Sequence, residues 1–240
     1  LADRVDEEAT IESFSVVGEF CSIDYQGDYE DILNNLNNAH IGSTTYGEQQ
    51  FNCSLYTGSS DPENIFMGRN FDNPTCDLLV GRYSPPDGYR SIAMTRISDL
   101  QIPQGTDYEN MSSALKQRLL KAPFFTADGM NEMGVAAGLA YVEYVPITID
   151  PEKETIWLTY WLRKILDSAA SVEEAVQITN SYNIVDNFYG PNTLCHHILV
   201  SDSNGNSAIL EYHEDQFVAI SSEVPWQVLT NSPIHNVPLQ

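Results

Sequence analysis

The segment NCSLYTGSSDPENIFMGRNFDN, residues 52–73, places a cysteine, an arginine and an aspartate where they could do chemistry together. Cys53 opens a strand-like run, and Arg69 and Asp72 follow in the phrase GRNFD. A hairpin around the turn TGSSDPEN would bring both charged residues back to the cysteine. The arginine would then stabilise a thiolate and the aspartate would hold an amine, so the segment predicts an activated nucleophile.

The nucleophile also needs a base, because a thiol with an ordinary pKa of about 8.5 is only partly ionised at neutral pH. No histidine stands in a phrase that indicates catalysis, and the adjacent His196 and His197 would point to opposite faces of a strand. A cut between Asn52 and Cys53 would supply an α-amine with a pKa of about 7.7–8.0 on the same residue as the thiol. This is the logic of N-terminal nucleophiles. The alternative is a buried, inert thiol and a surface Arg–Asp pair.

Composition excludes several classes of partner. The 240 residues are 42% hydrophobic and 10% aromatic, as in a globular protein with a sizeable core. With 34 acidic and 11 basic residues, a net charge of −23 argues against nucleic acid and anionic membrane surfaces as partners. No run of apolar residues is long enough for a membrane span. The chain starts without Met, so a lost export signal is considered and an extracytoplasmic location is slightly favoured.

The cysteines do not predict a metal site. Cys21, Cys53, Cys76 and Cys195 form no C-x-x-C pair and are too few for a disulfide scaffold. The phrase DSNGNS lacks the spacing of a calcium loop. No metal and no organic cofactor is therefore expected.

The pattern of predicted secondary structure changes near residue 52. Residues 1–52 contain a predicted helix at 29–40 and polar loop, and are interpreted as a propeptide or a cover for a pocket. Residues 53–240 are interpreted as the catalytic domain, with a C-terminal part expected to follow.

The later elements indicate an α+β fold. Strands are expected at 53–56, 65–69, 77–83, 91–97, 134–145, 194–200, 208–212, 217–220 and 226–230, and helices at 111–121, 155–170 and 171–181. The second of the two long helices begins at the S-x-x-E capping box of Ser171 and Glu174. Strands, two adjacent helices and then strands favour antiparallel sheets with helices packed outside.

Four phrases, in one order over residues 53–233, are similar to a known family. They are the cysteine followed by GRNFD, then DGMNEMGVAAG, HHILVSDSNGNSAILEY and WQVLTNSP. Together they resemble the choloylglycine hydrolase family of linear amide C–N hydrolases, and more closely its branch related to acyl-coenzyme A:6-aminopenicillanic acid acyltransferase. The resemblance implies the four-layer αββα sandwich of the N-terminal-nucleophile hydrolases.

The resemblance also assigns roles to particular residues. Cys53 would be the nucleophile, Arg69 and Asp72 match the family's arginine and aspartate, and Asn231 matches an asparagine that donates to the oxyanion. The cleavage site would be the Asn52–Cys53 bond.

The remaining assignments, which include one departure from the family pattern, are weaker. The second oxyanion donor falls at the backbone amide of Ala140 or Tyr141, where related bile salt hydrolases carry an asparagine. Asn131 is interpreted as shaping a turn rather than as catalytic. Asn73 stands where a tryptophan is common, which changes the pocket wall.

The activity implied is hydrolysis of a small-molecule amide through a thioester after autocatalytic cleavage. Bile salts, penicillin V, N-acyl homoserine lactones and fatty-acid amides are candidate substrates. The alternatives are an acyltransferase with the same nucleophile, an uncleaved or inactive member that binds an acyl ligand, and a zymogen covered by residues 1–52. A homo-oligomer is an alternative to a monomer.

Overall fold

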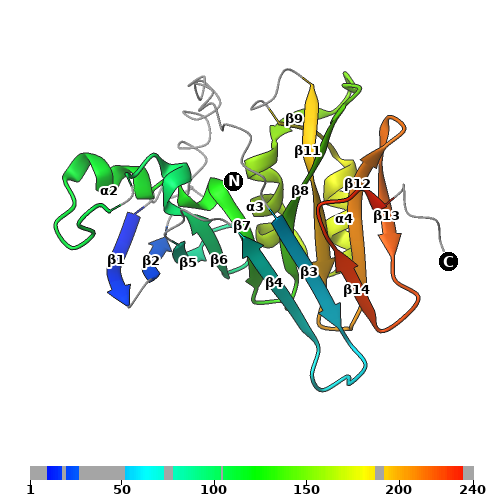
Figure 1. Ribbon diagram of the computed structural model, residues 1–240, viewed down its shortest axis with the longest axis horizontal. Helices are drawn as coiled ribbons and strands as arrows, with labels where there is room; N and C mark the ends of the chain where they lie inside the picture. Colours follow the sequence, from blue (N-terminus) through cyan, green and yellow to red (C-terminus); the bar gives the residue numbers. More distant parts are fainter. Residues whose placement is uncertain are drawn as a thin grey trace, which may run out of the picture.

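The computed structural model describes residues 10–17, 20–26, 52–72, 78–103, 105–186 and 192–234. Figure 1 shows two stacked β-sheets, with a small sheet in front and helices α3 and α4 behind the larger sheet. The helix expected at 29–40 lies outside the described residues. No helix in the described ranges is both long and apolar enough to cross a membrane.

A nine-stranded sheet forms the centre of the molecule, in the strand order β1-β2-β5-β6-β7-β8-β11-β12-β13. Neighbouring strands are antiparallel except for the parallel pair β2 and β5. The bounds are β1 (Thr10–Val17), β2 (Phe20–Gln26), β5 (Leu78–Ser84), β6 (Ser91–Arg96), β7 (Thr126–Asn131), β8 (Ala136–Pro146), β11 (Thr193–Ser201), β12 (Ser207–His213) and β13 (Gln216–Ser221). Because β1 and β2 extend this sheet, the described residues before Asn52 form a hairpin joined to its edge. The division at residue 52 stays a prediction.

The small sheet has three strands, in the order β14-β3-β4. They are β3 (Asn52–Gly58), β4 (Phe66–Asp72) and β14 (Trp226–Leu229). The predicted hairpin of β3 and β4 is confirmed, with Cys53 opposite Phe71 and Leu55 opposite Arg69. The outer face of this sheet exposes Tyr56, Phe66 and Trp226 in the part of the chain described here.

Two hydrophobic cores lie between the layers of helices and sheets. The larger core includes Trp161 and Leu162 of α3, which packs against β7 and β8. The smaller core lies between the two sheets and includes Cys53, Leu55 and Ala140. Gly138 permits this close approach, because a Cβ there would lie 2.4 Å from Cδ2 of Leu55. The predicted α+β class with stacked antiparallel sheets is confirmed.

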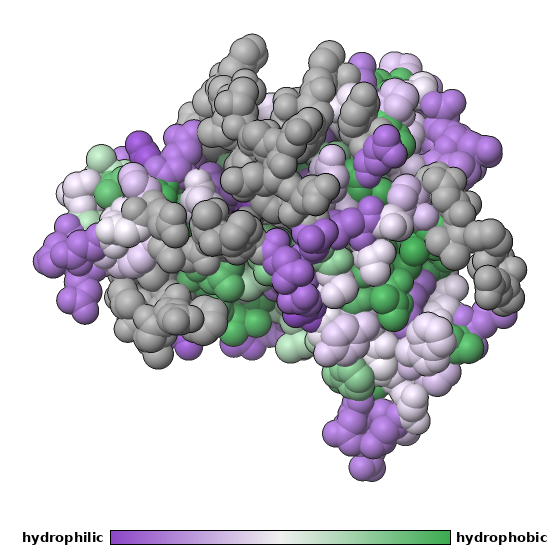
Figure 2. Space-filling view, in the orientation of Figure 1, coloured by the Kyte–Doolittle hydropathy of each residue, from purple (hydrophilic) through white to green (hydrophobic). Residues whose placement is uncertain are grey.

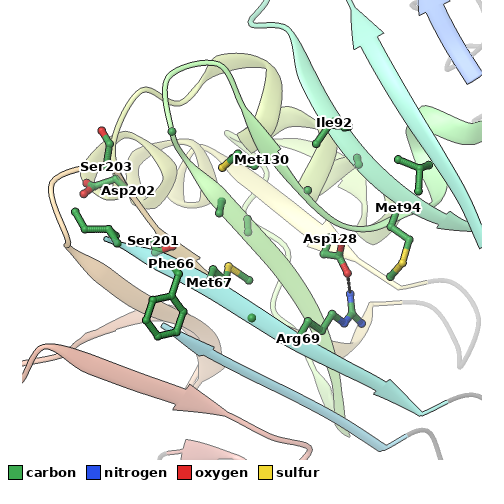
Figure 3. A pocket seen from close by; sticks show the side chains of 18 of the residues that line it. Phe66, Met67, Arg69, Ile92, Met94, Asp128, Met130, Ser201, Asp202 and Ser203 are labelled. Carbon is green, nitrogen blue, oxygen red and sulfur yellow. Dashed lines mark hydrogen bonds and ion pairs between the residues drawn. The ribbon is translucent and has the colours of Figure 1, made fainter. Parts of the chain in front are cut away.

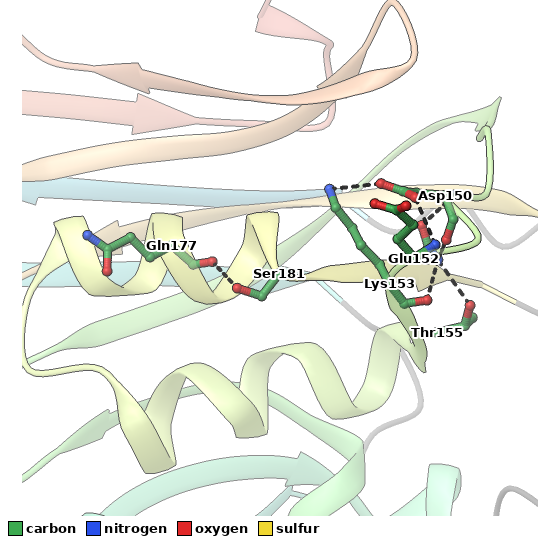
Figure 4. Close-up of polar contacts among 7 residues, drawn as sticks. Asp150, Glu152, Lys153, Thr155, Gln177 and Ser181 are labelled. Carbon is green, nitrogen blue, oxygen red and sulfur yellow. Dashed lines mark hydrogen bonds and ion pairs between the residues drawn. The ribbon is translucent and has the colours of Figure 1, made fainter.

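The first predicted long helix begins later than its apolar pattern indicates. Helix α3 spans Leu158–Ser168, while the preceding β9 (Glu154–Trp157) pairs in parallel with β10 (Tyr182–Val185). The β-branched and aromatic residues of β9 suit a strand once a partner is present. The Asn183 amide on β10 donates to the carbonyls of Asp150 and Lys153, in the turn before β9 (Figure 4).

Helix α4 (Val172–Asn180) begins with the predicted capping box. The Ser171 hydroxyl accepts a hydrogen bond from the Glu174 N–H at 3.2 Å, and the Glu174 carboxylate accepts one from the Ala170 N–H at 2.7 Å. At the other end the Ser181 hydroxyl donates to the Gln177 carbonyl (Figure 4). The shorter elements are α2 (Ser113–Leu119) and the 3-10 turns η1 (Ile97–Leu100) and η2 (Ala122–Phe125).

Candidate active site

Cys53 lies near the start of β3, and its side chain faces the large sheet. The residue is only 7% exposed and packs in the core between the two sheets. Its sulfur lies 3.7 Å from Nη2 of Arg69. A guanidinium beside the sulfur is the kind of positive environment in which a thiolate nucleophile is stabilised.

Asn231 contacts the backbone nitrogen of Cys53, which would become the α-amine after cleavage. The backbone N–H of Cys53 donates to Oδ1 of Asn231 at 2.6 Å, and Nδ2 of Asn231 donates to the Tyr141 carbonyl at 2.6 Å. A donor on one side and an acceptor on the other fix the orientation of the amide. One hydrogen of Nδ2 binds Tyr141, so the other is the one that could reach an oxyanion.

The Arg69 guanidinium joins two strands of the large sheet that diverge at this point. The register between β7 and β8 covers Asp128↔Gly138 to Met130↔Ala136. Beyond it, Arg69 donates to the carbonyl of Ala127 on β7 at 2.6 Å and to that of Leu139 on β8 at 2.9 Å. Only a planar, forked cation can make these contacts and still face the sulfur.

Asp128 is a site residue that the sequence analysis missed. Its carboxylate accepts a hydrogen bond from Nη1 of Arg69 at 2.8 Å, which makes a half-buried ion pair. Burial raises the pKa of the Asp128 carboxyl, and the charge of Arg69 offsets part of that effect. The phrase DGMNEMG contains this aspartate, and a buried arginine needs an acidic partner, so the signal was present.

The structure does not bring Asp72 to the nitrogen of Cys53. Asp72 is exposed at the end of β4, opposite Asn52 in the register, while the Cys53 N–H is bonded to Asn231. Successive side chains of a strand alternate in direction, so Asp72 lies on the other face from Arg69 and Phe71. In this uncut chain the predicted contact is therefore absent, and a role for Asp72 after cleavage stays a prediction.

The remaining candidates divide between structure and site. Oδ1 of Asn131 accepts from the N–H groups of Met133 and Val135, and its Nδ2 donates to two carbonyls of the α3 end, so its contacts shape a turn. Ala140 packs beside Cys53 in the inter-sheet core. Tyr141 contributes its carbonyl to Asn231. Whether the backbone N–H of Ala140 or Tyr141 binds an oxyanion stays a prediction.

A buried histidine supports the segment that carries Asn231. Nδ1 of His197 lies 2.8 Å from Oε2 of Glu211, and Nε2 lies 2.8 Å from the carbonyl of Thr230. The same Glu211 oxygen accepts from the Ile234 N–H at 3.0 Å. The imidazole therefore bridges the Glu211 carboxyl group on β12 and the backbone carbonyl of Thr230. The pair holds the chain on both sides of Asn231.

A pocket of about 980 Å³ lies beside Arg69, between β4 and the large sheet. Arg69 and Asp128 lie at one end, and Ser201, Asp202 and Ser203 lie at the other (Figure 3). Its lining is mainly apolar and includes Phe66, Met67, Phe71, Leu78, Val80, Ile92, Met94 and Met130. Figure 2 shows a hydrophobic area over β5 and β6, next to β4. The volume and lining suit a small molecule with an apolar part.

Residues 109–240, more than half of the chain, match the model of the linear amide C-N hydrolases, choloylglycine hydrolase family. The matched range contains Asp128, Tyr141 and Asn231 and begins after Cys53 and Arg69. The match assigns the chain to the linear amide C–N hydrolases as a class. Within that class the chain belongs to the choloylglycine hydrolase family, as its sequence motifs predicted.

Individual relatives align with part of the chain. A penicillin V acylase of Pectobacterium atrosepticum is 36% identical over 115 residues, which are 45% of this chain and 30% of that protein. Among solved structures, penicillin V acylase from Agrobacterium tumefaciens is 23% identical with a TM-score of 0.41, covering 77% of this chain and 45% of its own. A variant of conjugated bile acid hydrolase from Clostridium perfringens is 20% identical with a TM-score of 0.40, covering 77% and 47%. The chain thus spans less than half the length of each of these relatives.

Proposed function

We propose that Cys53 is the nucleophile of an amidase that hydrolyses a linear, non-peptide C–N amide bond through a thioester. The observation that carries this proposal is that both reactive groups of Cys53 have partners. The sulfur lies beside the guanidinium of Arg69, and the nitrogen lies 2.6 Å from Oδ1 of Asn231. Membership of the choloylglycine hydrolase family and the relative named penicillin V acylase support an amide as the bond attacked.

The first step is maturation at the Asn52–Cys53 bond. The Cys53 thiol adds to the carbonyl carbon of Asn52, the peptide C–N bond breaks, and the nitrogen of Cys53 takes up a proton. Water then hydrolyses the resulting thioester and releases the Asn52 carboxylate. This leaves a thiol and an α-amine on one residue, and Asn231 is already placed to accept a hydrogen bond from that nitrogen.

The second step is hydrolysis of the substrate. The free amine accepts the thiol proton, and the thiolate attacks the substrate carbonyl. The second N–H of the Asn231 amide stabilises the oxyanion while Arg69 supplies positive charge at the sulfur. When the substrate C–N bond breaks, the ammonium of Cys53 gives its proton to the departing amine. The amine of Cys53 then activates a water that hydrolyses the thioester.

The pocket beside Arg69 favours a substrate whose acyl group is apolar. Its aromatic and methionine side chains offer adaptable hydrophobic contacts, while Arg69 and Asp128 lie at one end and Asp202 at the other. Penicillin V, bile salts, N-acyl homoserine lactones and fatty-acid amides all combine an acyl group with a linear amide.

A hydrolysis screen across those four classes tests the proposal. Wild-type protein should release the free amine and the acid from at least one class, and Cys53→Ala should release neither while keeping the wild-type unfolding temperature. Turnover by Cys53→Ala at the wild-type rate would overturn the assignment of the nucleophile.

An acyltransferase is the second candidate, because it differs only in what resolves the thioester. Adding a competing amine during turnover separates the two activities. An amidase yields mainly the free acid, whereas an acyltransferase yields mainly the new amide.

A further inference from the structure

A second cluster of reactive side chains lies away from Cys53, where β10 ends beside β11. Sγ of Cys195 lies 2.5 Å from Oδ2 of Asp186 and 3.1 Å from Nδ1 of His196. The same His196 nitrogen lies 3.5 Å from the Asp186 oxygen. One sulfur, one nitrogen and one oxygen thus converge on a common point.

An irregularity in the sheet brings the two neighbouring residues together. The register of β11 with β8 passes from Leu194↔Val145 to His196↔Tyr141 and skips Cys195. In a regular strand adjacent side chains point to opposite faces, and the irregularity lets those of Cys195 and His196 meet. Sequence spacing could not show this, because it requires the pairing with β8.

Asp186 reaches the cluster from the end of β10. Its backbone N–H donates to the Thr193 carbonyl at 2.6 Å, and the Thr193 hydroxyl donates to the Asp186 carbonyl at 3.0 Å. These two bonds fix the position of the aspartate relative to β11. The third member of the cluster is therefore anchored by the backbone rather than carried on a free loop.

We propose that Asp186, Cys195 and His196 bind one divalent cation of the zinc class. Thiolate and imidazole ligands with a single carboxylate suit zinc better than magnesium or calcium, which prefer all-oxygen sites. A thiolate, a carboxylate and a dication sum to zero charge. That neutrality matters here, because Cys195 is fully buried and Asp186 is 1% exposed.

The distances require only a small rearrangement. In a tetrahedral zinc site with bonds of about 2.0–2.3 Å, ligand atoms lie roughly 3.3–3.6 Å apart. The nitrogen–oxygen and sulfur–nitrogen separations of 3.5 and 3.1 Å are near that range. The sulfur–oxygen pair, at 2.5 Å, must open by about 1 Å to admit the ion.

Of the three cluster residues, His196 is the one that lines a small cavity. His196 keeps a quarter of its side chain exposed and lines a cavity of about 10 Å³, together with Glu143 and Leu194. That space suits a single water ligand and is too small for a substrate. The edge of the Tyr141 ring against His196, with centroids 5.8 Å apart, helps to hold the imidazole.

The site would be structural and separate from the proposed nucleophile. Tyr141 and Ala140 are neighbours on β8, so their side chains point to opposite faces of the large sheet. Ala140 packs beside Cys53, whereas Tyr141 packs beside His196. The metal would tie β10 to the strands behind the active site. This inference does not rest on the proposed amidase activity.

Cobalt(II) substitution tests the proposal directly. Purified protein is stripped with a chelator and titrated with cobalt, and a thiolate-to-cobalt charge-transfer band should saturate at one equivalent. Cys53→Ala should keep the band, whereas Cys195→Ser should lose it. The variant His196→Gln changes a partly exposed side chain and leaves the core intact. It should bind cobalt at least about tenfold more weakly than the wild-type protein.

Elemental analysis of the untreated protein supplies a second readout, with about one zinc per chain expected. Absence of a cobalt band in the stripped wild-type protein would overturn the proposal. A band that survives in Cys195→Ser, or one lost in Cys53→Ala, would also overturn it, because the thiolate would then come from elsewhere.

Discussion

The Oδ1 atom of Asn231 lies 2.6 Å from the backbone nitrogen of Cys53, although 178 residues separate them in the sequence. The pairing of β14 with β3 produces this contact, since Asn231 follows Leu229, which lies opposite Leu55. The same amide donates to the Tyr141 carbonyl on the large sheet. One side chain therefore links both sheets to the candidate nucleophile.

Asn231→Ala should reduce kcat/KM for the identified substrate by about 10²–10³-fold, because it removes the proposed oxyanion donor and the observed acceptor for the nitrogen of Cys53. Steady-state kinetics with the best substrate of the screen provide the measurement. Asn70→Ala, on the exposed face of β4, is the matched control and should retain wild-type kinetics. Equal kinetics in Asn231→Ala and the control would remove Asn231 from the site.

Arg69→Met should lower kcat by about 10²–10³-fold, because the positive charge beside the sulfur is lost. Arg69→Lys should recover only part of this, since a lysine cannot reach the carbonyls of both Ala127 and Leu139. The exposed Arg90 pairs with Glu132, and Arg90→Lys serves as the control with unchanged kinetics. Full activity in Arg69→Lys would show that catalysis does not need the forked geometry of the guanidinium.

His197→Ala should lower the free energy of unfolding by about 1–3 kcal/mol, because it removes a buried hydrogen-bond partner of Glu211 and of the Thr230 carbonyl. It should also reduce kcat more than it changes KM, since Thr230 no longer holds Asn231 in position. Urea unfolding and kinetics on the folded variant measure the two effects. His213→Ala, on a half-exposed histidine, should be close to neutral in both. A stable His197→Ala with full kcat would rule out the positioning role.

Asp128 should make the free energy of unfolding decrease as pH rises. Burial raises its pKa above the ordinary 3.8, so the folded state binds this proton more tightly than the unfolded state. The stability contributed by Asp128 is therefore complete below pH 3.8 and is lost as pH rises through the raised pKa. Urea unfolding against pH should show that loss in wild type and a flatter profile in Asp128→Asn.

Asp61 offers a control of opposite sign. A hydrogen bond from Asn64 lowers the pKa of its carboxyl, so its contribution is present above pH 3.8 and is lost as pH falls through the lowered pKa. Asp61→Asn should therefore change the profile in the opposite direction to Asp128→Asn. Identical profiles for the two variants would contradict the environment assigned to Asp128.

Local sequence signals predicted the part of the site that one hairpin builds. The turn between β3 and β4 fixes the register, and this places Arg69 on the same face as Cys53. Alternation along the same strand puts Asp72 on the opposite face, which spacing alone could have indicated. Asn231 was predicted only through the family resemblance, because its contact depends on a strand pairing distant in the sequence.

The missed features all depend on tertiary partners. Strand β9 resembles the start of a helix until β10 pairs with it. Asp128 and Glu211 look like ordinary polar residues until their strands place them beside Arg69 and His197. The cluster of Asp186, Cys195 and His196 likewise appears only when the register of β11 shifts.

The intact mass of the purified protein, before and after one equivalent of an electrophilic β-lactone, tests the central claim most directly. We predict a fragment that begins at Cys53 and gains the mass of one lactone on that residue. An active protein that remains uncut at the Asn52–Cys53 bond, or one labelled at another residue, would contradict the account.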